Sequence, residues 1–413
     1  MNTDRVVLVG ASHASAQVCA GLRRDGWAGE IVMVGDEPSL PYQRPPLSKA
    51  FLAGESTLDD LLIRPAEFYA KEQVSFRQGR VTRIDRDAQT VELDGGGTLG
   101  YDKLVLCMGA RPRPLDVPGA DLDGVHVLRS VADTAAIRAG LPGAARAVVV
   151  GAGYIGLEAA ASLRKLGVAV TVLEVAGRVL QRVTAPEVSA FYDRVHREEG
   201  IDLRVGTGVA AVEGDGRVSG VRLTDGQVLA ADLVVVGVGV VPNVELAQEA
   251  GLEVENGIVI DAHGRTSDPD ILAAGDCAAY FDTRYDRRVR LECVSSAVEQ
   301  AKSVSATVCG KDRQIAALPW FWSDQFDLKL QIAGVSTGYE EIVLRGDPDG
   351  GRSFACFYFA GGRLIAADCV NRAQEFMFSK RAIAEGRSPD RALLADPQTP
   401  LASLLRAHAA SAG

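Results

Sequence analysis

The stretch from Val148 to Glu174 constrains this chain most, because it reads as a strand, a glycine-rich turn, a helix and a second strand. In the turn, GAGYIG, Gly151, Gly153 and Gly156 fill the three glycine positions of a G-x-G-x-x-G motif. These glycines permit a tight turn, close approach of a pyrophosphate and close packing of helix on strand. An acid at the end of the second strand can accept hydrogen bonds from ribose hydroxyls. The stretch therefore predicts a dinucleotide-binding site.

The acid at the end of this unit also predicts which nicotinamide nucleotide binds. Glu174 would repel a 2′-phosphate, and the next two residues, Val175 and Ala176, supply no arginine to hold one. Arg178 is the nearest cation that follows in the sequence. We therefore expect NADH rather than NADPH.

The N-terminus carries a second unit of the same plan. A strand at residues 6–9 leads to a turn that begins with Gly10, an apolar helix follows to about residue 24, and a strand at 31–34 precedes Asp36. Ser12 and Ser15 stand where the motif usually has glycine, but serine is small enough for a cofactor to approach closely. Two dinucleotide folds in one chain predict one site for FAD and one for NAD(P)H, with hydride transfer between them.

Three further segments support two dinucleotide domains. Residues 101–109 and 229–239 read as apolar strands that end at glycine and return the chain between domains. Residues 266–278, TSDPDILAAGDCA, predict a turn and a short strand that ends at Gly275 and Asp276. We expect Asp276 to hydrogen-bond the ribityl chain of a flavin.

Composition narrows the class of protein. The 413 residues suffice for two or three domains, and the net charge of −10 argues against general nucleic-acid binding. No apolar run approaches the length of a membrane span, and the seven cysteines lack any metal-ligand spacing, so we expect reduced thiols, no bound metal and a cytoplasmic protein. Without a C-x-x-C or C-x₄-C pair, and without a cysteine in residues 38–54, disulfide and peroxide reduction are disfavoured.

Taken together, these motifs resemble the FAD-dependent NADH:ferredoxin reductases that serve bacterial Rieske oxygenases and cytochromes P450. The resemblance spans essentially the whole chain and is most specific at residues 41–49, PYQRPPLSK, and 319–325, PWFWSDQ; it also includes 148–157, 236–243 and 275–276. It implies a glutathione-reductase-like α/β fold with two Rossmann-like domains and a C-terminal α+β domain. We expect a discontinuous FAD domain (1–112 and 245–318), an NAD domain (113–244) and a C-terminal domain (319–413). In the last, residues 328–334, 352–359 and 363–369 have strand character and 373–384 helical character.

The resemblance also implies residue roles. Lys49 would lie beside the flavin ring and pair with Glu158, and Trp322 would cover the outer face of the flavin near the electron exit; these three are the expected catalytic residues. The expected FAD contacts are Gly10, Ala14, Asp36, Arg44, Lys49, Val81, Arg129, Asp276, Val294 and Trp322. The expected NAD contacts are Gly151, Gly153, Tyr154, Ile155, Gly156, Glu158, Glu174, Gly237 and Gly239.

The function implied is electron transfer from NADH through FAD to a small [2Fe–2S] ferredoxin, by a monomer or weak homodimer. The ferredoxin would dock near the flavin edge, and the sequence offers two groups of cations for docking: Arg284, Arg287, Arg288 and Arg290, and then Lys329, Arg352 and Arg372. One alternative is an NADH oxidase or a quinone or radical reductase of the same fold. Another is an NADH-sensing flavoprotein of the apoptosis-inducing-factor kind.

Overall fold

The computed structural model describes residues 4–405, which divide into two compact units. The first contains residues 4–44, 57–111 and 240–317, and the second contains 45–56, 112–239 and 318–405. Two of the places where the chain passes between the units are at β8 (Ala110–Pro112) and β17 (Val240–Pro242). Residues 45–56, expected in the FAD domain, are thus grouped with the second unit.

The first unit is built on a parallel sheet in the order β19-β7-β1-β2-β3. Its strands are β1 (Arg5–Val9), β2 (Glu30–Gly35), β3 (Val74–Gln78), β7 (Lys103–Leu106) and β19 (Ile271–Ala273). Successive side chains of β1 point to opposite faces, so Val6 and Leu8 enter one apolar core and Val7 and Val9 another. Both faces of the sheet are therefore buried, as is typical of parallel sheets.

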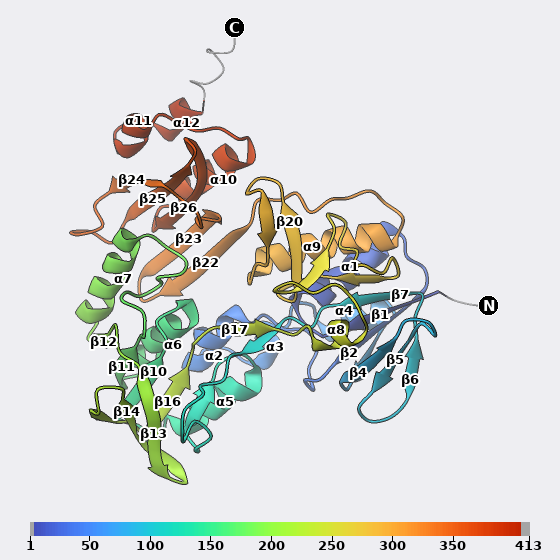
Figure 1. Cartoon of the computed structure of the whole chain (residues 1–413), viewed down its shortest axis with the longest axis horizontal. Helices are drawn as coiled ribbons and strands as arrows, with labels where there is room; N and C mark the ends of the chain where they lie inside the picture. Colours follow the sequence, from blue (N-terminus) through green and yellow to red (C-terminus); the bar gives the residue numbers. More distant parts are fainter. Residues whose placement is uncertain (1–3, 406–413) are drawn as a thin grey trace. The chain divides into compact units, whose positions relative to one another are not determined.

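Helices and two small sheets complete the first unit. The helices α1 (His13–Asp25) and α9 (Val294–Val308) lie side by side (Figure 1). The small sheets and short helices are β4 (Val81–Asp85), β5 (Thr90–Leu93) and β6 (Thr98–Gly100); β18 (Ile258–Ile260), β20 (Ala278–Asp282) and β21 (Arg287–Val289); and α3 (Leu58–Leu61), α4 (Ala66–Lys71) and α8 (Glu245–Glu249).

The second unit contains another parallel sheet, in the order β12-β11-β10-β16-β9. Its strands are β9 (Val125–Val127), β10 (Arg146–Val150), β11 (Ala169–Leu173), β12 (Asp202–Arg204) and β16 (Leu233–Val236). With it belong α2 (Ala50–Ala53), α5 (Val131–Gly140), α6 (Tyr154–Lys165) and α7 (Pro186–Glu198), a 3₁₀ turn at Pro45–Ser48, and a small sheet of β13 (Val209–Asp215), β14 (Arg217–Leu223) and β15 (Val228–Ala230). The glycine-rich turn lies between β10 and α6, as the sequence predicts.

The C-terminal part of the second unit is an antiparallel sheet with helices, seen in orange and red in Figure 1. Its order is β22-β23-β26-β25-β24, and its elements are β22 (Trp320–Gln325), β23 (Leu328–Gly334), β24 (Glu341–Gly346), β25 (Phe354–Ala360), β26 (Arg363–Val370), α10 (Ala373–Ala384), α11 (Arg391–Ala395) and α12 (Leu401–Leu404). Trp320 and Phe376 lie at the core between this sheet and α10.

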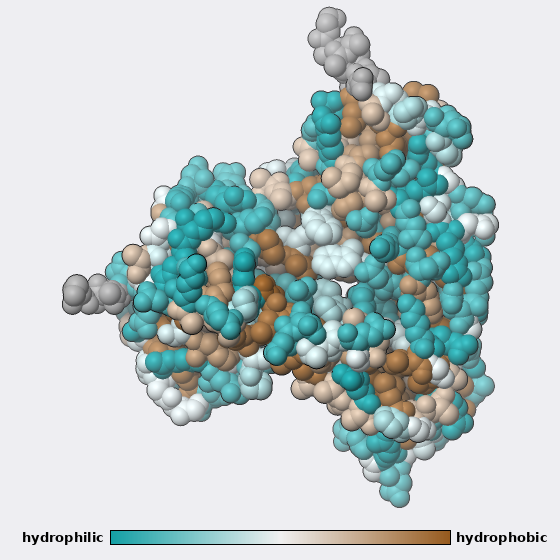
Figure 2. Space-filling view, turned by 180° about the vertical axis from the view of Figure 1, so that it is seen from behind, coloured by the Kyte–Doolittle hydropathy of each residue, from teal (hydrophilic) through white to brown (hydrophobic). Residues whose placement is uncertain are grey.

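The face drawn in Figure 2 is largely hydrophilic, and apolar side chains form smaller areas on it. Among residues 4–405, no helix combines the length and the apolar character that crossing a membrane requires.

Candidate functional site

The glycine-rich turn of the second unit leaves room for a phosphate group. Gly151 has φ of +104°, and a side chain there would meet the Gly237 carbonyl oxygen at 2.4 Å. A Cβ on Gly156 would lie 2.0 Å from the Gly151 carbonyl oxygen, whereas one on Gly153 would have nothing within 4 Å. Gly153 caps α6 without a side-chain hydrogen bond, so the cap leaves the first N–H groups of the helix available to a ligand. This arrangement fits the pyrophosphate of a dinucleotide.

Glu174 lies next to the same turn. Its carboxylate accepts hydrogen bonds from the backbone N–H of Ala152 and of Ala176, both at 2.8 Å. These bonds fix the carboxylate at the carboxyl end of β11 and leave further lone pairs for hydroxyl groups. Val175 beside it is 78% exposed and carries no charge. The geometry fits an unphosphorylated ribose.

The remaining predicted NAD residues differ in exposure. The ring of Tyr154 packs 4.8 Å from that of Phe321 in β22, and its hydroxyl is buried. Ile155 is 44% exposed at the start of α6. Gly239 has φ of +97°, and a Cβ there would lie 3.3 Å from the Arg182 guanidinium. The contact of Tyr154 with Phe321 joins α6 to the C-terminal sheet.

The first glycine turn of the chain has the same form despite its serines. Gly10 has φ of +103°, and a Cβ there would lie 2.3 Å from the Cys107 carbonyl oxygen. The buried Ser15 hydroxyl accepts from the Ser12 N–H at 2.8 Å and bonds the Ser12 carbonyl at 2.9 Å. Ser15 thus stabilises the first turn of α1 where the motif has glycine.

Arg44 contacts several polar side chains near this turn. Its guanidinium lies 2.7 Å from Glu37 and 3.3 Å from the Ser12 hydroxyl, and it also bonds Tyr42 at 3.2 Å. Burial opposes its charge, but Tyr42, Glu37 and Asp276 outweigh this and raise the pKa of Arg44. The carboxyl ends of β1, β2 and β19 therefore meet around a fixed cation, which fits a pyrophosphate-containing cofactor.

The other predicted FAD residues are distributed over both units. In the first unit, Asp36 is exposed after β2, Val81 is buried at the start of β4, and Val294 begins α9. A Cβ on Gly275 would lie 3.4 Å from the Ala14 side chain, so the turn before Asp276 adjoins α1. Lys49, Arg129 and Trp322 belong to the second unit. Trp322 lies in β22 with its ring 5.4 Å from that of Trp320.

The second unit brings Lys49 and Glu158 together. The Lys49 ammonium lies 2.5 Å from the Glu158 carboxylate, which is only 2% exposed. Ser48 and Ser323 also bond this carboxylate, at 2.5 and 2.6 Å. Sequence reasoning missed both serines. Ser323 lies within the 319–325 motif, but no feature of the motif indicates which residue it contacts.

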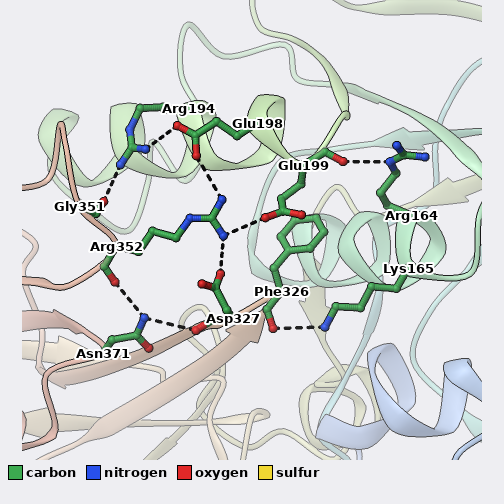
Figure 3. Close-up of polar contacts among 10 residues, drawn as sticks. All are labelled: Arg164, Lys165, Arg194, Glu198, Glu199, Phe326, Asp327, Gly351, Arg352 and Asn371. Carbon is green, nitrogen blue, oxygen red and sulfur yellow. Dashed lines mark hydrogen bonds and ion pairs between the residues drawn. The ribbon is translucent and has the colours of Figure 1, made fainter.

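Arg352, one of the cations expected for docking, joins elements of the second unit. Its guanidinium lies 2.6 Å from Asp327, 2.8 Å from Glu199 and 3.2 Å from Glu198 (Figure 3). A cleft of about 500 Å³ beside it is also lined by Arg164, Lys165 and Phe326. Ion pairs also engage Arg284 with Asp282, Arg288 with Glu255, and Arg290 with Glu292.

We expect Arg352→Met to lower the stability of the protein by about 1 kcal/mol, because three carboxylates lose their shared cation while the aliphatic stem is kept. Thermal unfolding at low and high salt measures this, and the loss should shrink as salt screens the remaining charges. Arg363→Met, at an exposed position of β26, is the control. A loss that is equal in both variants would contradict the interpretation.

The thiols of this chain are poor nucleophiles. Burial raises the pKa of all seven, to about 12 for Cys19 and about 11 for Cys277. None is in a disulfide. Since the thiolate is the attacking form, these cysteines are poorly suited to disulfide or peroxide reduction.

The chain matches known proteins over almost its whole length. Residues 4–301 match the family model "Pyridine nucleotide-disulphide oxidoreductase", and residues 320–405 match "Reductase C-terminal". Putidaredoxin reductase of Pseudomonas putida is 46% identical over 98% of this chain and 97% of its own, and a ferredoxin–NAD(P)(+) reductase of a Sphingomonas species is 44% identical over 97% of both.

Solved structures extend the similarity to the fold. The covalent putidaredoxin reductase–putidaredoxin complex matches with a TM-score of 0.95, at 46% identity, over 99% of both chains. A ferredoxin reductase from Rhodopseudomonas palustris matches with a TM-score of 0.94, at 41% identity, over 97% of this chain and 99% of its own. These matches confirm the predicted fold class and the use of FAD and a nicotinamide nucleotide. The chain belongs to the ferredoxin reductase family of FAD-dependent pyridine nucleotide oxidoreductases.

Proposed function

We propose that this protein transfers electrons from NADH through FAD to a [2Fe–2S] ferredoxin that supplies a cytochrome P450 or a Rieske oxygenase. The observation that carries the proposal is the full-length similarity to putidaredoxin reductase, which includes the C-terminal domain. The raised thiol pKa values support it, because they disfavour the thiol chemistry of other reductases with this fold. Reduced thiols also support a location in the cytoplasm.

Residues of the chain would hold the two cofactors and place a charge near the flavin. When bound, FAD accepts a hydride from NADH and passes the electrons on one at a time. Arg44 and the turn at Gly10 would hold its phosphates, while the turn at Gly151 and Glu174 would hold NADH. Lys49, held by Glu158, would place a positive charge near the flavin.

We further propose that Trp322 shields the flavin and that the ferredoxin docks near the flavin edge on a monomer or weak homodimer. Of the cations expected for docking, Arg284, Arg288 and Arg352 already pair with carboxylates of this chain. The exposed Lys329 would therefore supply docking charge more readily. If docking is electrostatic, electron transfer slows as salt rises.

We expect Glu174→Arg to raise the KM for NADH about tenfold and to improve the use of NADPH, because the ribose acceptor is replaced by a cation that attracts a 2′-phosphate. The ratio of kcat/KM values for the two nucleotides measures this. Glu187→Arg, at an exposed position at the start of α7, makes the same change of charge and is the control. An unchanged ratio in the Glu174 variant would remove Glu174 from the ribose site.

The proposed function is tested by NADH oxidation with cytochrome c as final acceptor, with and without a [2Fe–2S] ferredoxin from a bacterial oxygenase system. We expect cytochrome c reduction to depend strongly on the ferredoxin. Equally fast NADH consumption without ferredoxin would indicate an oxidase or quinone reductase. Slow turnover with NADH-dependent dimerisation would indicate an NADH-sensing protein.

A further inference from the structure

The carboxylate of Glu158 is held by more than its lysine. One oxygen, Oε2, accepts from the Lys49 ammonium and the Ser48 hydroxyl, both at 2.5 Å. The other oxygen, Oε1, bonds the Ser323 hydroxyl at 2.6 Å. A carboxylate that is only 2% exposed requires such donors, because burying a charge without partners is costly. Ser323 therefore holds the carboxylate oxygen that Lys49 does not contact.

The hydrogen bonds continue beyond Ser323 into the interior. The Gln325 side-chain amide bonds the Ser323 hydroxyl at 3.0 Å, and its carbonyl oxygen lies 2.8 Å from His196 Nε2. Ser323 and Gln325 are two residues apart in β22, so they share one face of the strand, together with Phe321. Phe321 contacts α6, and His196 is part of α7. This face of β22 therefore spans from the glutamate to the histidine.

We propose that Ser323, Gln325 and His196 form a one-directional hydrogen-bond chain that positions the Glu158 carboxylate and, through it, the Lys49 ammonium. This inference rests on the proposed role of Lys49 beside the flavin. The three residues do not touch the reacting atoms in this scheme. They are positioning residues for flavin reduction by NADH.

The direction of the chain follows from counting protons. The Ser323 hydroxyl has one proton, and a carboxylate can only accept, so that proton points to Glu158. The Ser323 oxygen must then accept from Gln325, which requires the NH₂ group of the amide on that side. The amide oxygen consequently faces His196 Nε2, which must carry a proton. Each group donates toward Glu158.

The state of His196 agrees with this direction. Burial lowers the pKa of its ring to about 4, so it is neutral near pH 7 and has a single ring proton. That proton is used at Nε2. The other nitrogen, Nδ1, is buried without a partner among the described residues, and is then a bare acceptor. The opposite tautomer would bury an unpaired N–H and place two acceptors face to face, so it is disfavoured.

The hydrogen-bond chain links residues that are far apart in the sequence. His196 and Gln325 are 0% and 1% exposed, and Ser323 is 0% exposed. Because these side chains are enclosed, they have few alternative positions, and the carboxylate that they orient is equally restricted. A rigid anion in turn restricts Lys49, whose ammonium is the less buried end of the chain at 20% side-chain exposure.

The test compares Ser323→Ala with Ser323→Thr in the FAD-loaded protein, without ferredoxin. We expect Ser323→Ala to slow flavin reduction by NADH about tenfold and to make the flavin midpoint potential more negative. A tenfold weaker preference for the reduced flavin corresponds to about 30 mV for a two-electron couple. Ser323→Thr, which keeps the hydroxyl, should retain most of both properties. Gln325→Leu should shift them in the same direction as Ser323→Ala.

Ser379→Ala is the matched control, because Ser379 is a fully buried serine of the C-terminal domain whose hydroxyl bonds the Glu375 carbonyl oxygen. We expect it to change neither the rate nor the potential. The proposal is overturned if folded Ser323→Ala keeps both properties of the unchanged protein, or if Ser323→Thr is as impaired as Ser323→Ala. If Lys49→Met also leaves the flavin potential unchanged, the proposed role of Lys49 is wrong. If Ser323→Ala leaves it unchanged but Lys49→Met does not, only the proposed hydrogen-bond chain is wrong.

Discussion

Replacing Lys49 with methionine will slow the reduction of bound FAD by NADH about 100-fold, which is the scale typical of removing one preorganised electrostatic contact. Negative charge develops on the flavin when it accepts hydride, and the ammonium is held on a nearly buried carboxylate 2.5 Å away. Methionine keeps an unbranched side chain but removes the charge. Stopped-flow absorption of the flavin, followed after mixing with NADH under anaerobic conditions, measures the effect.

The reciprocal change tests the pair from its other end. Glu158→Gln keeps the shape of the side chain but replaces the anion that orients Lys49, so we expect a smaller fall in the same rate. The amide also brings an N–H group toward Lys49 or toward the serines, which leaves one hydrogen bond unmade. If the rate effects arise through one pair, the double variant will be less impaired than the two single effects combined predict.

Lys165→Met is the control for the loss of a positive charge, since the Lys165 ammonium bonds the Phe326 carbonyl oxygen at 3.2 Å and lies on the surface of the same unit. We expect its rate of flavin reduction to remain within about twofold of the unchanged protein. Equal slowing by Lys49→Met and Lys165→Met would show a general charge effect instead of a specific contact.

The second large effect concerns stability and pH. Asp368 in β26 is fully buried, and its Oδ2 accepts from the hydroxyls of Thr184 and Tyr358. Its Oδ1 has no partner among the described residues. Burial outweighs these two hydrogen bonds and raises the pKa of Asp368 from its ordinary value of 3.8 to about 6. The folded protein therefore binds the carboxyl proton of Asp368 more tightly than the unfolded chain does.

The pKa of Asp368 is higher in the folded than in the unfolded protein. The protonated carboxyl therefore contributes stability below about pH 4, and this contribution is lost as pH rises through about 6. A difference of about two units corresponds to about 3 kcal/mol. We expect Asp368→Asn, which cannot ionise, to gain stability relative to the unchanged protein over this range, and the gain to level off above about pH 7. Thermal or denaturant unfolding of both proteins from pH 4.5 to 8 measures this difference.

Asp324→Asn is the control, because Asp324 is exposed in β22. Its stability relative to the unchanged protein should vary little over the same pH range. A difference between Asp368→Asn and the unchanged protein that does not depend on pH would show that Asp368 keeps an ordinary pKa in the folded state. The absolute level of that difference also includes the amide N–H at the unpartnered Oδ1 position, so the slope with pH is the informative quantity.

The strands and the helix of the C-terminal domain were predictable because their signals are local. The helix expected at 373–384 is α10, and the strand expected at 328–334 is β23, with the same bounds. The strand expected at 352–359 is β25 and begins two residues later, at Phe354. Side-chain periodicity and glycine positions act over a few residues, so a single sequence contains them.

The contacts of charged residues were less predictable. Arg352 reads as a free surface cation in the sequence, yet it bonds Glu198 and Glu199 of the α7 end and Asp327 of the β22–β23 turn. The Lys49–Glu158 pair was expected only from the family resemblance. Many carboxylates are available to each cation, and only the packing of distant elements selects among them.

The sequence by itself determined the two glycine turns, the strands and helices that flank them, and the acid at Glu174, because backbone sterics and short-range patterns depend on neighbouring residues. Only the tertiary structure decided that Ser323 and Gln325 face Glu158 and His196. A strand pattern shows that alternate residues share a face, but not which helix packs against that face. The partners of a buried polar group are set by this packing, since each must be matched where water is excluded.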